Sequence, residues 1–401
     1  MLFFSCAKEE KISPAVVVPV DTTITPLLLL KEYAIPPTKI NIKAYANANY
    51  PRFNYSKYIY DISDTNFSYC HPDVQYFENG FRGYRYWMVF TPYFGKVGHQ
   101  AFSKRYENPT IVVSNDGVNW EEPPGIHNPI QSCPSVKESF REMKGEDIQG
   151  FWSDVDWLFR DGQFELYYRG SCIQQKALAN RGAKSANNRK KLKEKNARRS
   201  IVRQTSEDGV NWTGLELAYS SNVPATPKDN HLISPSFIDV QGQVISYEVE
   251  FDWQSFRYGS FDNTHVVQRK SDNGLDFTSF AECKQVNFVN APWNEKVNEG
   301  IWHLNACYVS GYYFMALSVG QISKYTSDKL YLAYSKDGLN FWVDPKPVVS
   351  ENAYRSAIFP LKVSQDQITF AGIWGNKSGE FYYSSWDLNM DPIRNLSANL
   401  K

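Results

Sequence analysis

No run of apolar residues in this 401-residue chain approaches the length of about 20 that a membrane-spanning helix needs. The 43 Lys and Arg residues balance 43 Asp and Glu residues, which argues against a nucleic-acid binder with a globally basic surface. None of the six cysteines belongs to a CxxC pair, which argues against a zinc cluster. The patterns GxGxxG, P-loop, HExxH and GxSxG are also missing, so nucleotide-binding and serine-hydrolase functions have no support.

A seven-residue motif, in contrast, occurs four times. It reads SNDGVNW at Ser114–Trp120 and SEDGVNW at Ser206–Trp212, and it returns as SDNGLDF at Ser271–Phe277 and SKDGLNF at Ser335–Phe341. Its Asp-Gly or Asn-Gly pair supplies the positive φ that a tight β-hairpin needs, and its final Trp or Phe can pack between neighbouring sheets. Recurrence at a regular interval indicates a repeat architecture.

The interval between the motifs is about 64 residues. Trp120 and Trp212 are 92 residues apart, whereas the intervals that end at Phe277 and Phe341 are 65 and 64 residues. The first interval contains Lys176–Arg203, a stretch of 28 residues of which 11 are Lys or Arg. Without this stretch the first interval is also 64 residues, so we interpret the stretch as a basic insertion in one repeat. It is expected to be a solvated loop or helix, or else to contact an anionic glycan or membrane surface.

Each repeat contains short runs rich in Val, Ile, Tyr, Phe and Trp, which are typical of β-strands. Three such runs and a fourth after the Asp-Gly hairpin make four strands per repeat, which is the composition of a propeller blade. A fifth, partial unit follows Phe341 and needs a strand from elsewhere, for which we expect a segment near Lys39–Tyr45. We therefore predict an all-β, five-bladed β-propeller with four-stranded antiparallel blades, closed by an N-terminal strand. A β-sandwich and a six-bladed ring are the alternatives.

The N-terminal segment differs from the rest of the chain. Apolar Leu2–Phe4 and a small residue precede Cys6, which resembles the end of a bacterial lipoprotein signal with its acylated cysteine. Residues 7–37 contain five prolines and no clear period, as a tether does. We therefore expect residues 1–37 to be a signal remnant and tether, and residues 38–401 to be the propeller. The protein is expected to be a monomer, exported to the periplasm or the outer-membrane surface, where only the lipid at Cys6 contacts a membrane.

In a propeller the first strand of each blade lines the central channel, so a ligand site there takes one or two residues from each blade. Side chains alternate along a strand, so His71 and Asp73 share a face, as do Asp154 and Asp156. Polar residues also stand where the first strands of the other blades begin, namely at Ser234–Ser236, Trp302–Asn305 and Arg355–Ser356. Such residues either contact a ligand or bond to loop backbone and fix the starts of the blades.

The blade pattern and the S-x-D-G-x-N-W hairpins resemble those of the five-bladed propeller glycoside hydrolases of families 43, 32, 62 and 68, especially the arabinanase and xylosidase type. The resemblance implies hydrolysis of glycosidic bonds in a polysaccharide or oligosaccharide by carboxyl groups in the central funnel, one protonated and one ionised. Matching the strands implies Asp73 as base, Asp154 as orienting carboxylate, and Glu248 or Glu250 as acid, since Ile233–Ser236 lacks the family's Glu.

The remaining polar and aromatic residues at the strand starts are predicted to bind substrate; they are His71, Trp152, Asp156, His303 and Arg355. The expected partner is a carbohydrate, consistent with 15% aromatic residues that can stack on sugar rings. No nucleic-acid partner, catalytic metal or cofactor is expected, and a structural calcium ion in the channel is left open. The alternative function is a glycan-binding surface lipoprotein without catalysis, and a third is an interaction propeller that binds no sugar.

Overall fold

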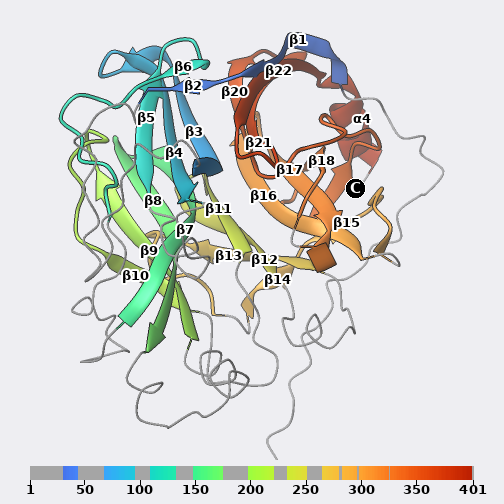
Figure 1. Cartoon of the computed structure of the whole chain (residues 1–401). Helices are drawn as coiled ribbons and strands as arrows, with labels where there is room; N and C mark the ends of the chain where they lie inside the picture. Colours follow the sequence, from blue (N-terminus) through green and yellow to red (C-terminus); the bar gives the residue numbers. More distant parts are fainter. Residues whose placement is uncertain are drawn as a thin grey trace, which may run out of the picture.

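The computed structural model shows a ring of five small antiparallel sheets (Figure 1). The residues that it describes are 30–43, 67–94, 109–131, 148–174, 197–220, 233–250, 264–279, 282–295, 298–324 and 326–399. The predicted five-bladed β-propeller is therefore confirmed. The predicted lipid anchor at Cys6 lies outside the described residues.

The sheets follow one another along the chain. Blade one contains β3 (Phe67–Phe81), β4 (Tyr84–Phe94), β5 (Thr110–Ser114) and the short β6 (Asn119–Trp120). Blade two contains β7 (Ile148–Arg160), β8 (Gln163–Gln174), β9 (Ala197–Ser206) and β10 (Glu216–Ser220). Blade three contains β11 (Ile233–Val240), β12 (Gln243–Glu250), β13 (His265–Ser271) and β14 (Lys284–Gln285).

Blade four contains β16 (Glu299–Val309), β17 (Tyr312–Gln321), β18 (Lys329–Ser335) and β19 (Asn340–Val343), to which β15 (Asn287–Phe288) adds in parallel. Blade five contains β20 (Ser356–Val363), β21 (Gln367–Gly375) and β22 (Phe381–Asn389). A short 3-10 helix, η5 (Ile322–Lys324), follows β17, and a helix, α4 (Asp391–Asn399), follows β22. The first strands β3, β7, β11, β16 and β20 pack against their neighbours around the centre of the ring.

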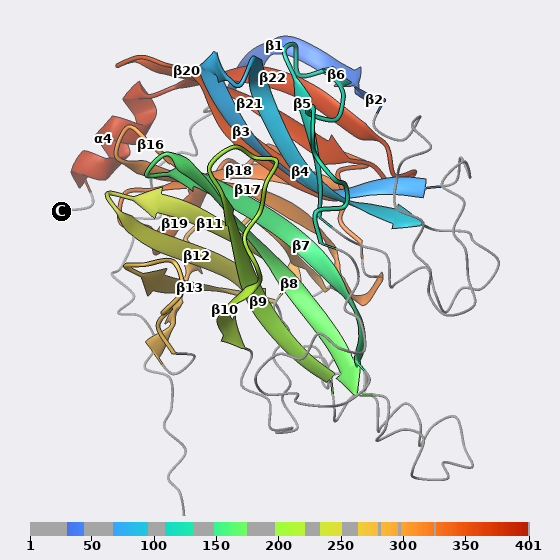
Figure 2. The ribbon, with the colours of Figure 1, turned by 90° about the vertical axis from the view of Figure 1, so that its left-hand side faces the viewer.

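The ring is closed by the N-terminal strand β1 (Leu30–Lys39), which pairs antiparallel with β22 as the outermost strand of blade five (Figures 1 and 2). Next in the chain, β2 (Asn41–Ile42) pairs with β6 of blade one. The strand begins before residue 38, the boundary predicted for the propeller. Pro36 and Pro37 suggested a tether, but they lie in a strand at the edge of a sheet, where a missing N–H breaks no pairing with a further strand.

The predicted basic insertion is shorter than its composition indicates. Residues 197–203 of the stretch Lys176–Arg203 belong to β9, which pairs with β8 in regular antiparallel register. Arg203 is held there because it contacts Glu165 at 3.4 Å and Glu216 at 2.9 Å. The predicted insertion included this arginine, whereas in the structure Arg203 belongs to β9 and its carboxylate partners lie on the two neighbouring strands, β8 and β10.

The repeated motif forms the same hydrogen-bonded turn in each of the four blades that carry it. In blade two, Asp208 Oδ1 accepts from the amides of Val210 at 2.8 Å and Asn211 at 2.7 Å, and Ser206 Oγ donates to the same carboxylate at 3.0 Å. The glycine of each motif then lies against an aromatic side chain of the preceding blade, either its ring, as Gly209 does against Trp87, or a tyrosine hydroxyl, as Gly274 does against Tyr167. The motif is therefore both a turn and a joint between blades.

Replacing Gly209 with alanine should lower the free energy of unfolding by about 3 kcal/mol, since a left-handed conformation and an overpacked core each cost 1–3 kcal/mol. Gly209 has a φ of 73°, and an added Cβ would lie 2.3 Å from Cζ3 of the Trp87 ring. Urea denaturation measures the effect. Gly214→Ala is the matched control, because a Cβ there meets nothing within 4 Å. Equal stability of the two variants would contradict the role of the motif as a joint.

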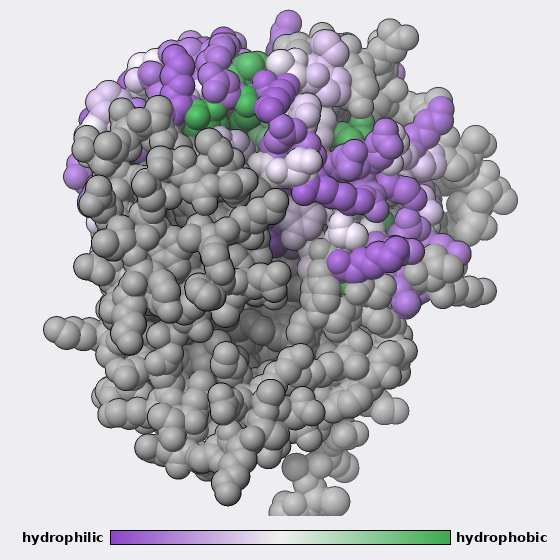
Figure 3. Space-filling model, in the orientation of Figure 1, coloured by the Kyte–Doolittle hydropathy of each residue, from purple (hydrophilic) through white to green (hydrophobic). Residues whose placement is uncertain are grey.

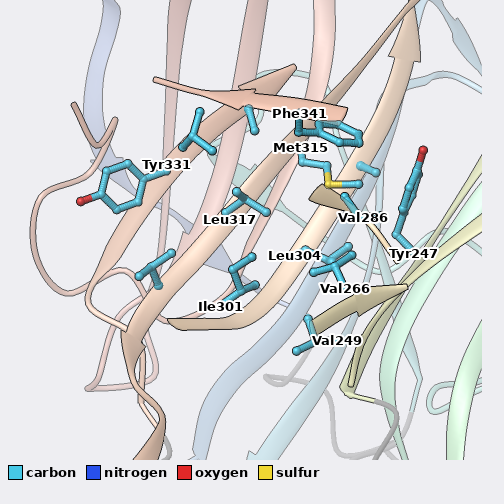
Figure 4. Packing of buried hydrophobic residues seen from close by; sticks show 14 of the residues in the cluster. Tyr247, Val249, Val266, Val286, Ile301, Leu304, Met315, Leu317, Tyr331 and Phe341 are labelled. Carbon is cyan, nitrogen blue, oxygen red and sulfur yellow. The ribbon is translucent and has the colours of Figure 1, made fainter. Parts of the chain in front are cut away.

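Between neighbouring blades the space is filled by apolar and aromatic side chains. Figure 4 shows the junction of blades three and four, where Val249 of β12 and Val266 of β13 face Leu304 of β16. Phe341, which ends the fourth motif, lies in the same cluster near Tyr247, with ring centroids 5.9 Å apart. The prediction that the closing aromatic residues pack between sheets is therefore confirmed.

On the face that Figure 3 shows, the described surface is largely hydrophilic. Among the described residues, the large hydrophobic side chains that are exposed are Leu217 and Val363, which lie in different blades. No helix in the described part of the chain is both long enough and apolar enough to cross a bilayer.

Candidate functional site

Each of the five inner strands places two residues, two positions apart, toward the centre of the ring. The first residue of each pair belongs to a set that we call the rim layer, comprising His71, Asp154, Ser234, His303 and Arg355. The second belongs to a set that we call the link layer, comprising Asp73, Asp156, Ser236, Asn305 and Ala357. Except for Arg355, which directly precedes β20, these residues lie within the inner strands.

The link layer joins four of the five blades to the next by a hydrogen bond from backbone to side chain. Its four acceptors take backbone N–H groups of the following blade: Asp73 from Trp157 at 2.8 Å, Asp156 from Phe237 at 2.6 Å, Ser236 from Ala306 at 2.9 Å and Asn305 from Ile358 at 2.8 Å. Buried backbone N–H groups need such partners, so these side chains hold the inner strands in register. Ala357 has no acceptor to offer to blade one.

Asn305 also connects the two acidic members of this layer. Its Nδ2 atom donates to Asp73 Oδ1 and to Asp156 Oδ2, each at 3.1 Å. Burial raises the pKa of Asp73 to about 7, against hydrogen bonds from Trp157, Val74 and Asn305 that lower it. Burial, and then the nearby Asp73, raises the pKa of Asp156 well above its usual value. The surroundings of Asp73 are thus those of a link between blades, and its predicted role as base stays a prediction.

Three residues of the rim layer are held in an unusual backbone conformation. His71, Asp154 and Ser234 have φ values of 54°, 53° and 47°, and each lies in a β-bulge of its inner strand. A left-handed conformation is unfavourable for residues other than glycine, and such residues cluster at functional sites. The bulge re-aims each side chain, so that the three converge although they come from three blades.

Asp154 lies at the centre of the rim layer. Its Oδ1 atom is 3.1 Å from Nε2 of His71 and also contacts Nη1 of Arg355, while its Oδ2 atom is 2.5 Å from Nε of Arg169. The carboxylate is fully buried, and Arg169, which reaches it from β8, has a side chain only 13% exposed. A buried carboxylate needs such partners, because burial without them would cost several kcal/mol.

Ser234 and His303 form a second contact in this layer. The Ser234 hydroxyl is hydrogen-bonded to Nδ1 of His303 and lies 3.3 Å from Asp154 Oδ1, and it accepts from Nη1 of Arg355 at 3.1 Å. Burial lowers the pKa of His303 to about 3, against the nearby Asp154, which raises it. The imidazole is therefore neutral at physiological pH, with Nε2 left without a hydrogen-bond partner among the described residues.

The rim layer surrounds a small cavity of about 20 Å³. Its lining includes all five rim residues together with Asp156, Asn305 and Ser356. A cavity needs at least ~10–15 Å³ for one water molecule, so this one accepts a single small polar group rather than a sugar ring. The described residues thus form the floor of the funnel, onto which a polar group of a larger ligand would reach.

Several residues predicted to form the site lie elsewhere. Trp152 is completely buried between blades one and two, against Tyr168, and does not line the cavity. Trp152 was predicted from its place at the start of the strand, but the bulge after Ser153 changes the alternation of faces, so Trp152 does not share the face of Asp154. Glu248 and Glu250 lie on β12, the second strand of blade three, and neither lines the cavity.

Glu248 and Glu250 have a separate buried environment. Glu248 contacts Arg269 at 3.2 Å and accepts a hydrogen bond from Tyr219 of blade two. Burial, and then the nearby Glu248, raises the pKa of Glu250 to about 8, so its carboxyl is protonated near neutral pH. That state suits a general acid, but the position on the second strand leaves the acid role a prediction.

Sequence reasoning missed Arg169 and did not include Ser234 among the site residues. Arg169 follows the apolar run of β8 and is paired with Ser153 across the blade. An arginine after the apolar run of a second strand is the signal that could have found it, since such a side chain is rarely buried without a carboxylate. Among the described residues no group of three or more His, Cys, Asp or Glu side chains is arranged to hold a metal ion.

Comparison with known proteins gives one local similarity in sequence. No family model matches the chain. Over 81 residues, 20% of the chain, it is 41% identical to an A type blood N-acetyl-alpha-D-galactosamine deacetylase of Flavonifractor plautii. The matched part spans 10% of that protein's length, far less than the whole enzyme.

The fold is shared more widely. The chain resembles the crystal structure of an N-acetylgalactosamine deacetylase from F. plautii in complex with blood group B trisaccharide, with a TM-score of 0.57 and 20% identity over 80% of this chain and 89% of that one. A family 117 glycoside hydrolase of Zobellia galactanivorans matches with a TM-score of 0.47 and 14% identity over 83% of this chain and 89% of that one. At these identities the likeness concerns the fold.

Proposed function

We propose that this protein is a glycan-processing hydrolase whose substrate binds over the rim layer. The observation that carries the proposal is the convergence of five polar side chains from five blades on one cavity, three of them in strained backbone conformations. Burying polar and charged groups costs stability that an apolar channel would not lose, and such sites are kept for function. The local similarity to a glycan deacetylase supports a glycan as substrate.

Two hydrolytic reactions fit this proposal. Cleavage of a glycosidic bond uses a protonated and an ionised carboxyl group, for which Glu250 as acid and Asp73 as base stay the candidates, with Asp154 as the orienting carboxylate. Removal of an N-acetyl group is favoured by the 81-residue similarity to the F. plautii deacetylase. A glycan-binding protein without catalysis is the alternative to both.

The reactions are distinguished by their products. Purified protein is incubated with a panel of plant, microbial and host glycans, and both new reducing ends and free acetate are measured. New reducing ends identify a glycosidase, and free acetate identifies a deacetylase. Saturable binding without either product after long incubation would overturn the hydrolase proposal in favour of the glycan-binding alternative.

Ser234 and Ser236 provide a matched test of the two layers, because they lie two positions apart on one strand. Ser234→Ala removes a rim hydroxyl that contacts His303, so activity should fall at least ~100-fold, the usual effect of losing a positioned polar group. Ser236→Ala leaves the buried N–H of Ala306 without an acceptor, so the free energy of unfolding should fall by about 1–2 kcal/mol while activity is kept. The reverse pattern would place catalysis in the link layer.

A further inference from the structure

Together with Arg169 of β8, the rim layer carries more positive than negative charge. Its charged centre consists of the Asp154 carboxylate between the guanidinium groups of Arg169 and Arg355, one negative group against two positive ones. His303 is neutral, and burial, and then the nearby Asp73, raises the pKa of Asp156, which reduces its negative charge. Burial lowers the pKa of Arg355 to about 9, which still leaves it cationic at neutral pH.

Three side chains that line the cavity also have a polar atom without a hydrogen-bond partner among the described residues. They are Nε of Arg355, Nε2 of His303 and Oγ of Ser356. Arg355 Nε can only donate, and a serine hydroxyl can donate. The single Ser234 proton is donated to Asp154 Oδ1, so Nδ1 of His303 donates to the Ser234 oxygen and Nε2 of the neutral ring is an acceptor.

We infer that the funnel floor is a subsite for an anionic substituent of the glycan, a carboxylate or a sulfate ester. This inference rests on the proposed function. The two unpaired donors, Arg355 Nε and Ser356 Oγ, and the excess of guanidinium groups over the Asp154 carboxylate call for a group that has several acceptor oxygens and a negative charge. Hydrogen bonds from charged donors to such a group are about twice as strong as those between neutral groups. A buried donor left unpaired costs ~1–3 kcal/mol, so a neutral hydroxyl, with one acceptor oxygen, satisfies this floor less well.

The direct test uses the wild-type protein and pairs of ligands that differ only in charge. Isothermal titration calorimetry compares oligogalacturonate with its methyl ester, and a sulfated galactan oligosaccharide, which carries no carboxylate, with its desulfated form. At least one acidic ligand should bind about 10-fold or more tightly than its neutral partner, which is ~1.4 kcal/mol. Its affinity should also fall at high salt. The pair that shows the difference tells whether the group is a carboxylate or a sulfate.

The arginine can be tested separately. Arg355→Met should abolish the preference for the acidic ligand, whereas Arg82→Met, at an exposed arginine that does not line the cavity, should leave it unchanged. If neutral glycans are bound or processed as well as acidic ones, the inference falls and the proposed function stands. If no glycan of the panel binds or reacts, both fall together.

Discussion

Replacing Asp154 with asparagine should lower the free energy of unfolding by about 3–5 kcal/mol and abolish turnover. The carboxylate is fully buried and contacts two arginines, one through each oxygen. An amide in its place turns an N–H donor toward a guanidinium and leaves two buried cations with no negative partner. Removing one partner of a buried ion pair lowers the free energy of unfolding by about 3–5 kcal/mol. The loss of activity follows because His71, Ser234 and Arg355 are all positioned by this carboxylate.

Urea denaturation and the product assay measure the two effects independently. The assay is run at low temperature with samples that are folded by circular dichroism, so that lost activity is not lost protein. Asp272→Asn is the control, because this exposed carboxylate in the third hairpin motif contacts only Gln243 among the described hydrogen bonds. An Asp154→Asn variant as stable as the control would show that the rim layer does not depend on this charge.

Raising the pH from about 5 to about 9 should destabilise the protein, and Glu250 should contribute on the order of 4 kcal/mol of that loss, since one pKa unit is 1.36 kcal/mol. Burial, and then Glu248, raises the pKa of Glu250 from 4.5 to about 8. Because the folded state holds the proton more tightly, the stabilisation is complete below pH 4.5 and is lost as the pH rises through 8. Asp73, with its pKa raised to about 7, adds a slope in the same direction.

Glu250→Gln isolates this contribution, because glutamine keeps the shape and does not ionise. The unfolding free energy is measured across the pH range for the wild type, for this variant and for Glu351→Gln, an exposed control. The variant should lose much of the decline between pH 5 and 9 and retain the part caused by Asp73. If the wild type and Glu250→Gln run parallel, Glu250 is ionised throughout and is no candidate for a general acid.

The sequence predicts the fold of this protein well because the repeated turn motif depends only on residues close together in the chain. Each Ser-x-Asp-Gly turn makes its hydrogen bonds within seven residues, as Ser206 and Asp208 do, so its recurrence counts blades without any knowledge of contacts. The strand at Leu30–Lys39 was harder to place, because its prolines are compatible with an edge strand only once β22 is beside it.

The site was predicted in part, and for a physical reason. Alternation along a strand brings His71, Asp154, His303 and Arg355 to the channel, but it gives Asp73 and Asp154 the same status. Only the next blade distinguishes them, since its backbone N–H occupies Asp73 and its neighbourhood supplies Arg169 to Asp154. Contacts between strands far apart in sequence therefore decide which partners each of two equivalent positions receives.

The link layer has a consequence for how this ring can come apart. At four junctions a link-layer side chain accepts a hydrogen bond from a backbone N–H of the following blade. Ala357 cannot accept such a bond, so the junction of blades five and one lacks it. At that junction the N-terminal strands connect the blades instead, because β1 pairs with β22 of blade five and β2 pairs with β6 of blade one. We therefore expect the ring to open first at the junction of blades five and one when it is pulled. A circular permutation at this junction should also disturb the fewest hydrogen bonds of the link layer.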